Sequence, residues 1–132
     1  MTRDEFNAFC AALPGASHVV QWGGSDVWKV SGKVFAVCGW ADRTAETPRP
    51  AFTFKVTEMA FEILPQLPGL RPAPYMASRG LKWIQDHAGG LSDEELKRHL
   101  HASYDLVVEG LPKRAKAALS GEASPLRKLT RE

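Results

Sequence analysis

The sequence predicts a single α+β domain, in which a mostly antiparallel sheet of about five strands carries helices on one face. Three observations predict this class. Apolar residues recur at helical spacing near both ends of the chain, alternating residues fill the stretch between them, and short turns join the alternating segments. The expected order is α-β-β-β-β-α-β-α. A length of 132 residues suits one domain and is too short for two ordinary ones.

The first helix is expected to begin after Thr2, because Thr2 and Glu5 have the spacing of a capping box. Pro14-Gly15 should end this helix after about three turns. Between these signals, the apolar residues at helical spacing are Phe6, Phe9, Cys10 and Leu13.

The apolar period then changes to two, which predicts four consecutive strands. Ser31-Gly32 has the composition of a two-residue hairpin turn between the second and the third. In the last of the four, Thr53 and Lys55 alternate with apolar residues, as expected for a sheet with one wet face. The strands are expected at residues 18–22, 26–30, 33–40 and 51–56.

A short helix, a fifth strand and a long helix should follow. Thr57 can cap a helix over residues 58–64. After the proline-rich stretch that follows, residues 81–85 resemble a strand. Ser92 and Glu95 form a second capping box, at the start of the long helix. The apolar stripe of that helix comprises Leu96, Leu100, Tyr104, Val107 and Leu111.

The domain is expected to span residues 1–119, followed by a frayed tail at 120–132. The composition, 44% apolar and 24% charged, is that of a soluble globular protein. No apolar run approaches the ~20 residues of a membrane span, and the polar N-terminus resembles no targeting signal. We therefore expect a cytoplasmic protein with no membrane partner. Cys10 and Cys38 should be buried, reduced thiols.

Catalytic and metal-binding motifs are weak. His99 and His101 are two residues apart on a helix, so they point in different directions and cannot share a metal ion. His18 and His87 are each isolated in the sequence. No metalloprotease, phosphate-loop, dinucleotide-binding or nucleophile-elbow motif is present. We expect no enzymatic activity, no cofactor and no metal.

The charge pattern is mildly basic towards the C-terminus. Residues 69–132 hold eleven Lys and Arg against eight Asp and Glu, whereas residues 1–68 hold six against seven. Within this half, Trp83 lies beside Lys82 and four residues after Arg79. Aromatic rings among cations are what proteins use to bind single-stranded nucleic acid. The alternative interpretation is a core tryptophan with ordinary surface cations.

Four segments resemble the MmcQ/YjbR family of small bacterial proteins. They are WGGSDVWKVSGKVFAV at 22–37, FTFKVTEMAFEIL at 52–64, RPAPYMASRGLKWIQ at 71–85, and HASYDLVVEGLPKRAK at 101–116. The resemblance implies a curved antiparallel sheet, similar to frataxin-type and double-wing DNA-binding architectures. It also implies DNA binding, a role described for the family on the basis of that fold similarity.

The first functional hypothesis is therefore a non-catalytic nucleic-acid-binding protein, with DNA as the partner. Its contact residues would be Lys29, Lys33, Lys55, Arg79, Lys82 and Trp83, and Tyr75 would anchor the loop at 69–85. A protein- or small-ligand-interaction module without catalysis is the alternative. Iron handling by likeness to frataxin ranks lowest, because the first helix offers only Asp4 and Glu5 towards an acidic ridge. We expect a monomer.

Overall fold

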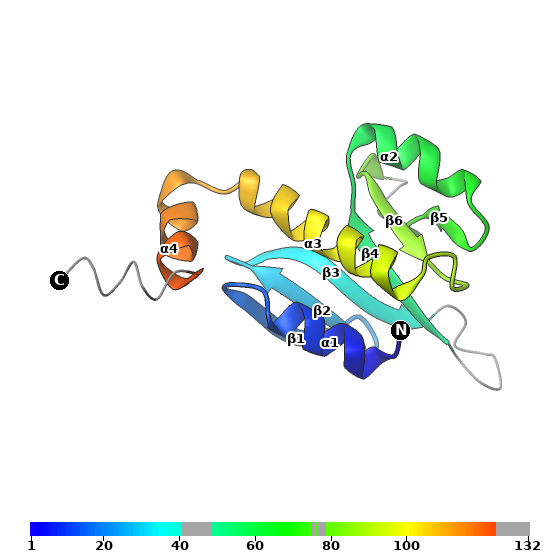
Figure 1. Cartoon of the computed structure of the whole chain (residues 1–132), viewed down its shortest axis with the longest axis horizontal. Coiled ribbons are helices and arrows are strands. Elements are labelled where there is room, and N and C mark those ends of the chain that lie inside the picture. The colour runs from blue at the N-terminus through cyan, green and yellow to red at the C-terminus, as the bar shows by residue number, and fades with distance from the viewer. Residues whose placement is uncertain (41–48, 75, 77–78, 124–132) are drawn as a thin grey trace.

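A computed structural model describes residues 1–40, 49–74, 76 and 79–123. It shows an α+β fold, in which α1 and α3 cover one face of a six-stranded antiparallel sheet (Figure 1). The elements, in chain order, are α1 (Arg3–Ala11), β1 (Ala16–Gln21), β2 (Ser25–Val30), β3 (Lys33–Trp40), β4 (Pro50–Lys55), α2 (Glu58–Ile63), a 3-10 helix η1 (Leu64–Gln66), β5 (Leu70–Pro72), β6 (Trp83–Asp86), α3 (Asp93–Glu109) and α4 (Lys113–Ala123).

The strands lie in the order β1-β2-β3-β4-β6-β5, with every neighbouring pair antiparallel. The first four strands form a meander of short connections. The chain then leaves the sheet through α2, forms the edge strand β5, and returns as β6 between β4 and β5. This insertion brings the residues of β5 and β6 beside the centre of the sheet, although they are distant from β3 in sequence.

The core lies between the sheet and the two helices that cover it. Phe6 and Cys10 of α1 are fully buried, as are Phe35 and Phe54 of the sheet. The stripe expected on the long helix is confirmed, because all of its members are buried in the same cluster: Leu96, Leu100, Tyr104, Val107 and Leu111. Burial of these apolar side chains is the main source of stability of such a domain.

Local signals in the sequence placed several elements correctly. Both expected capping boxes form, at Thr2 with Glu5 and at Ser92 with Glu95. Ser31 and Gly32 have φ angles of 49° and 78°, the pair of positive values that a type I′ hairpin turn requires. The third strand has the expected bounds, Lys33–Trp40.

Two features of the chain differ from the expected elements. The proline-rich stretch, in which no strand was expected, contains a sixth strand, β5. After a break at Pro112 the chain forms a separate helix, α4, as far as Ala123. The first four residues of the expected frayed tail are therefore helical, and residues 124–132 lie outside the described residues.

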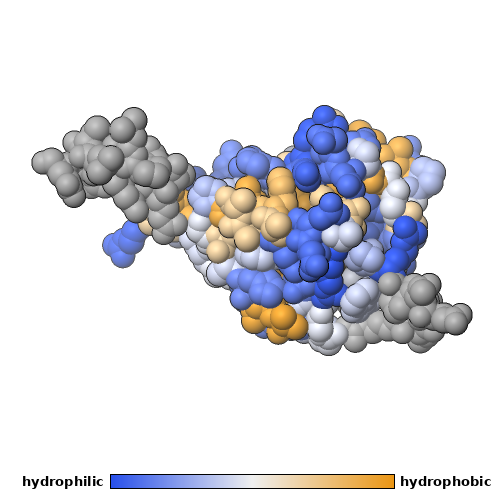
Figure 2. Space-filling view, turned by 60° about the horizontal axis from the view of Figure 1, so that its bottom comes forward, coloured by the Kyte–Doolittle hydropathy of each residue, from blue (hydrophilic) through white to orange (hydrophobic). Residues whose placement is uncertain are grey.

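Exposed apolar side chains are few and fall into separate groups. Those of the described residues are Val20 on β1, Trp22, Trp40 and Leu81 near one another, and Met59, Ile63 and Leu67 along α2 and η1. On the face seen in Figure 2, hydrophilic residues likewise separate the hydrophobic areas. No helix among the described residues is long and apolar enough to cross a membrane.

Candidate functional site

The two faces of the sheet differ in what they carry. Phe52 and Phe54 of β4 point into the core beneath α1 and α3, so the alternating Thr53 and Lys55 lie on the opposite face. We call this opposite side the open face, although Val37 and Thr53 at its centre are buried, with 8% and 7% of their surface exposed, so the wet face expected at Thr53 was wrong. The strand register aligns one row of residues across it: Val19, Val27, Val37, Thr53, Gln85 and Arg71. Along this row the side chains change from apolar to polar.

A groove of about 630 Å³ lies over the polar half of this row. Its floor is formed by residues of four neighbouring strands, namely Val37, Thr53, Gln85 and Arg71. Its walls are formed by two tryptophans and by the segment between β5 and β6. Volumes of this size are typical of ligand-binding clefts. We take this groove as the candidate functional site.

The polar floor is a ladder of side chains on three strands. Arg71 Nε donates a hydrogen bond of 2.8 Å to Oε1 of Gln85. Gln85 Nε2 lies 3.5 Å from Oγ1 of Thr53, at the limit of hydrogen-bond length. Because Arg71 donates to the amide oxygen, the NH₂ group of Gln85 faces the other way and retains most of its capacity to donate.

The two tryptophan walls come from the ends of β1 and β3. Trp22 is 58% exposed and Trp40 is 37% exposed. Trp22 has a φ angle of 50°, a conformation that costs a bulky residue energy and often occurs at functional sites. The guanidinium of Arg3 lies 4.6 Å from the centre of the Trp40 ring and covers one of its faces.

Another wall is formed by the described residues between β5 and β6. The N–H of Ala73 donates to the carbonyl of Trp83 at 2.9 Å, which holds the start of the segment to the sheet. The N–H groups of Arg79 and Leu81 both donate to the carbonyl of Met76, at 3.1 and 3.0 Å. These turns place Met76, Arg79 and Leu81 along the groove.

The structure brings only part of the expected contact set together. Strand alternation puts Lys29 and Lys55 on the open face, opposite Val34 and Trp83 respectively, and Lys55, at the end of β4, also lines a separate pocket beside α2 and α3. Arg79 lines the groove. The expected loop anchor, Tyr75, lies outside the described residues.

Three other expected contact residues are buried or turned away from the open face. Trp83 is only 8% exposed, so the expectation of an exposed ring that stacks on bases was wrong. Lys82 turns to the helix side, where its Nζ lies 4.8 Å from the centre of the Phe61 ring in α2. Lys33 pairs with Val30, a core residue, and therefore stands on the helix-covered side of the sheet.

The groove also contains residues that the sequence did not single out: Trp22, Trp40, Thr53, Arg71 and Gln85. The tryptophans carried a weak signal, since Trp22 directly follows β1 and Trp40 is the last residue of β3. Arg71 and Gln85 carried none, because their alignment depends on the pairing of β5 with β6.

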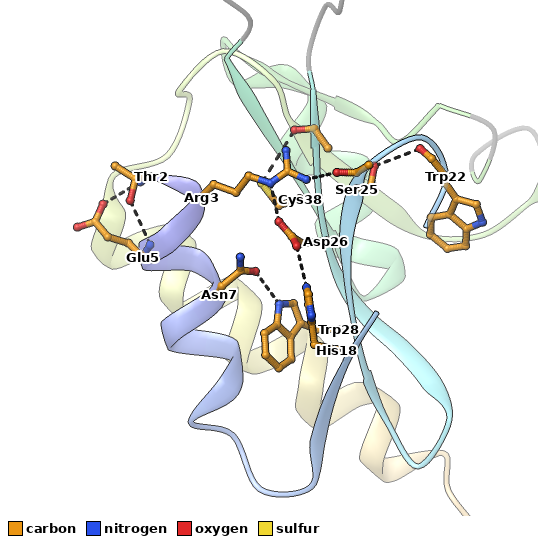
Figure 3. Close-up of polar contacts among 12 residues, drawn as sticks. Thr2, Arg3, Glu5, Asn7, His18, Trp22, Ser25, Asp26, Trp28 and Cys38 are labelled. Atoms are coloured by element: carbon orange, nitrogen blue, oxygen red, sulfur yellow. Dashed lines mark hydrogen bonds and ion pairs between the residues drawn. The ribbon is translucent and has the colours of Figure 1, made fainter. Parts of the chain in front are cut away.

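A second polar cluster lies on the helix-covered side and supports the two tryptophans of the groove (Figure 3). Asp26 accepts a hydrogen bond of 2.5 Å from Arg3 Nε, and its other oxygen lies 2.7 Å from Nε2 of His18. Arg3 also donates to the carbonyl of Gly24, in the turn that follows Trp22. The same arginine therefore fixes that turn and stacks on Trp40.

Asp26 is charged in this cluster. Burial alone would raise the pKa of Asp26, but hydrogen bonds from Arg3, His18 and Asn7, with the positive charge of Arg3, outweigh burial and lower it. The hydroxyl of Ser25 points to the carbonyl of Trp22 at 3.5 Å, while His18 contacts Asp26. The cluster thus resembles a structural ion pair more than a nucleophile with its base.

Potential metal ligands are dispersed in the described part of the chain. No group of three or more His, Cys, Asp or Glu side chains there is placed to hold a metal ion.

Comparisons with known proteins place this fold in a family. A family model described as YjbR matches residues 11–106. The crystal structure of a Deinococcus radiodurans protein with a DUF419 domain is similar, with 23% identity, a TM-score of 0.71, and coverage of 90% of this chain and 88% of that one. A Pseudomonas syringae protein has 20% identity and a TM-score of 0.66, with 80% and 98% of the two chains covered. None of the curated proteins compared with this chain matches it.

Proposed function

This chain belongs to the YjbR family, and from the geometry of its open face we propose that it binds nucleic acid there without catalysing a reaction. The observation that carries the proposal is the groove itself. It places two exposed tryptophans beside Arg71 and Arg79. Aromatic rings that stack on bases, next to cations that contact phosphates, are the usual means of binding single strands.

The charge distribution on the sheet supports an anionic ligand. The strand positions on the open face include Lys29, Lys55 and Arg71, but no Asp or Glu among the described residues. The two strand carboxylates, Asp26 and Asp86, point to the helix-covered side, where Arg3 and backbone N–H groups bind them. A surface with cations and no carboxylate attracts phosphate groups.

His87 directly follows β6, the strand whose Gln85 lies on the floor of the groove. Its pKa is lowered, first by burial and then by the charges of Arg71 and Arg49, although Asp86 opposes them. A phosphate bound near Arg71 would offset that repulsion.

Fluorescence anisotropy of a labelled oligodeoxynucleotide, at low and at moderate salt, tests the proposal. We expect binding that weakens steeply as salt rises, because phosphate contacts release counterions. In the Lys29→Ala, Lys55→Ala double variant, the slope of log K against log salt should fall by about two. The matched control is Lys97→Ala with Lys116→Ala, two exposed lysines on α3 and α4, which should leave the slope unchanged. Absence of binding at low salt, or equal slopes for both double variants, contradicts the proposal.

A small ligand or a short peptide is the second candidate, and the apolar lining of the groove favours it. Val37, Ala73, Met76 and Leu81 provide that lining, and the volume of about 630 Å³ suits a small molecule. A thermal-shift screen of small anions, nucleotides and peptides discriminates the two. Stabilisation by a ligand without phosphate, together with no oligonucleotide binding, would favour this second candidate.

A further inference from the structure

We propose that the groove on the open face accepts one unstacked nucleobase, so that this chain binds single strands in preference to duplexes. The inference rests on the proposed nucleic-acid function and adds the form of nucleic acid and the role of the groove. A flat basic surface alone would bind strand and duplex through their phosphates. What distinguishes this surface is a groove with a polar floor and apolar walls.

The polar side chains of the floor can form hydrogen bonds with the edge of a base. Bases that leave the stack are held by hydrogen bonds to their edges, and Asn or Gln amides are common partners of adenine. Gln85 presents such an amide, with its orientation set by the 2.8 Å hydrogen bond from Arg71. Thr53, on the adjacent strand, adds a hydroxyl beside it at 3.5 Å. These two groups supply both a donor and an acceptor at the bottom of the groove.

The walls suit the faces of the same base. Trp40 lines the groove and keeps 37% of its surface exposed, although Arg3 covers one face of its ring. Arg3 is itself held by Asp26 at 2.5 Å, so the ring is supported from behind. Met76 and Leu81 also line the groove and add apolar surface to it. Apolar and aromatic walls of this kind hold extruded bases by stacking and packing.

The cations lie where a backbone would pass. Arg79 is exposed and lines the groove beside Leu81, and Lys55 lies on the open face one row from Thr53. A base in the groove therefore brings its phosphates close to positive charge. A duplex keeps its bases paired and stacked, so one of its bases can enter the groove only at the free-energy cost of unpairing and unstacking it.

Three labelled probes of equal length test the inference: a mixed-sequence single strand, its blunt duplex, and a strand of abasic sugar-phosphate units. We expect the single strand to bind at least tenfold more tightly than either of the others at low salt, because stacking and edge contacts are lost without an accessible base. Equal binding of all three probes overturns the inference and leaves the proposed function standing. Failure of every probe to bind overturns the proposed function and, with it, the inference.

Substitutions in the groove provide the second arm of the test. Gln85→Leu and Trp22→Leu should each weaken single-strand binding about tenfold and leave duplex binding unchanged. Trp22 is included because its ring is 58% exposed, so its replacement should not prevent folding. Gln21→Leu is the matched control, since Gln21 lies on the open face but does not line the groove. Equal losses for strand and duplex, or a loss in Gln21→Leu alone, would contradict the base-binding groove.

Discussion

The hydroxyl of Ser103 on α3 donates a hydrogen bond of 2.6 Å to the main-chain carbonyl of Phe35 in β3. The same hydroxyl accepts a bond of 2.8 Å from the N–H of Lys55 in β4. The register between β2 and β3 shifts beside this point, at Trp28 and Lys29, as in a β-bulge. Two backbone groups beside this irregularity, the carbonyl of Phe35 and the N–H of Lys55, thus have Ser103 as a hydrogen-bond partner that the sheet does not supply.

Replacement of this hydroxyl should weaken the fold. Ser103→Ala leaves a buried carbonyl and a buried N–H without a partner, and we expect a loss of about 2 kcal/mol in the free energy of unfolding. Urea denaturation measures it. Ser17→Ala, at an exposed position of β1, is the control and should change stability by less than about 0.5 kcal/mol. A similar small change in both variants would mean that the Ser103 bridge contributes nothing.

Removal of the charge on Asp26 should loosen the support of the groove. Asp26→Asn weakens the bonds to Arg3 and His18, and we expect a loss of about 2 kcal/mol in the free energy of unfolding. Because Arg3 also stacks on Trp40, the tryptophan emission of the folded variant should change. A variant with wild-type stability and wild-type emission would show that the ion pair supports neither the fold nor Trp40.

The contribution of Asp26 should depend on pH in one direction. Its pKa in the folded protein is below that of an unfolded aspartate, about 3.9, so folding favours the charged form. The contribution is complete above pH ~5 and is lost as the pH falls through the folded pKa. Denaturation from neutral pH to pH ~3 should therefore show the stability difference between wild type and Asp26→Asn shrinking. A difference that grows as pH falls would contradict the assigned direction.

Trp83 should behave as a structural residue. Its side chain is 8% exposed, so Trp83→Ala should cost about 3–5 kcal/mol in stability. Trp83→Phe keeps an apolar ring and should fold. Oligonucleotide affinity of the Phe variant should stay within about twofold of wild type, as measured by anisotropy. A large loss of affinity in a folded Trp83→Phe protein would show that the Trp83 ring contributes to oligonucleotide binding.

The two thiols should be unreactive in the folded protein. Burial raises the pKa of both Cys10 and Cys38 to about 12, so little thiolate is present at neutral pH. Labelling with an aromatic disulfide reagent should be slow in buffer and fast in denaturant. Rapid labelling of either thiol under native conditions would contradict the burial seen here.

Local chemistry made much of the fold predictable. Capping boxes at Thr2 and Ser92 and the turn at Ser31-Gly32 depend on residues within four positions, and all three form as expected. β5 escaped prediction because it is three residues long and ends in Pro72, so it has no alternating pattern to detect. Its strand character comes from pairing with β6.

The site was less predictable than the fold for the same reason. Arg71 and Gln85 are fourteen residues apart and meet only when two strands pair. Trp83 looked like a surface ring because Lys82 and Arg79 are near it in sequence. In the structure alternation along the strand turns Lys82 to the helix side, near α2, and puts Trp83 on the open face. The side chain of Trp83 is nevertheless buried there, which its sequence neighbours do not reveal.

The most direct test of the binding groove is heteronuclear NMR of the four tryptophan indoles during titration with a single-stranded oligonucleotide. The groove predicts that the Trp22 and Trp40 signals shift together as the strand is added. Trp28 is the internal control, because its indole N–H is bonded to Asn7 at 2.9 Å on the helix-covered side, and its signal should stay in place. Shifts of Trp28 with Trp22 and Trp40 unchanged, or no shift of any indole at low salt, would contradict binding in the groove.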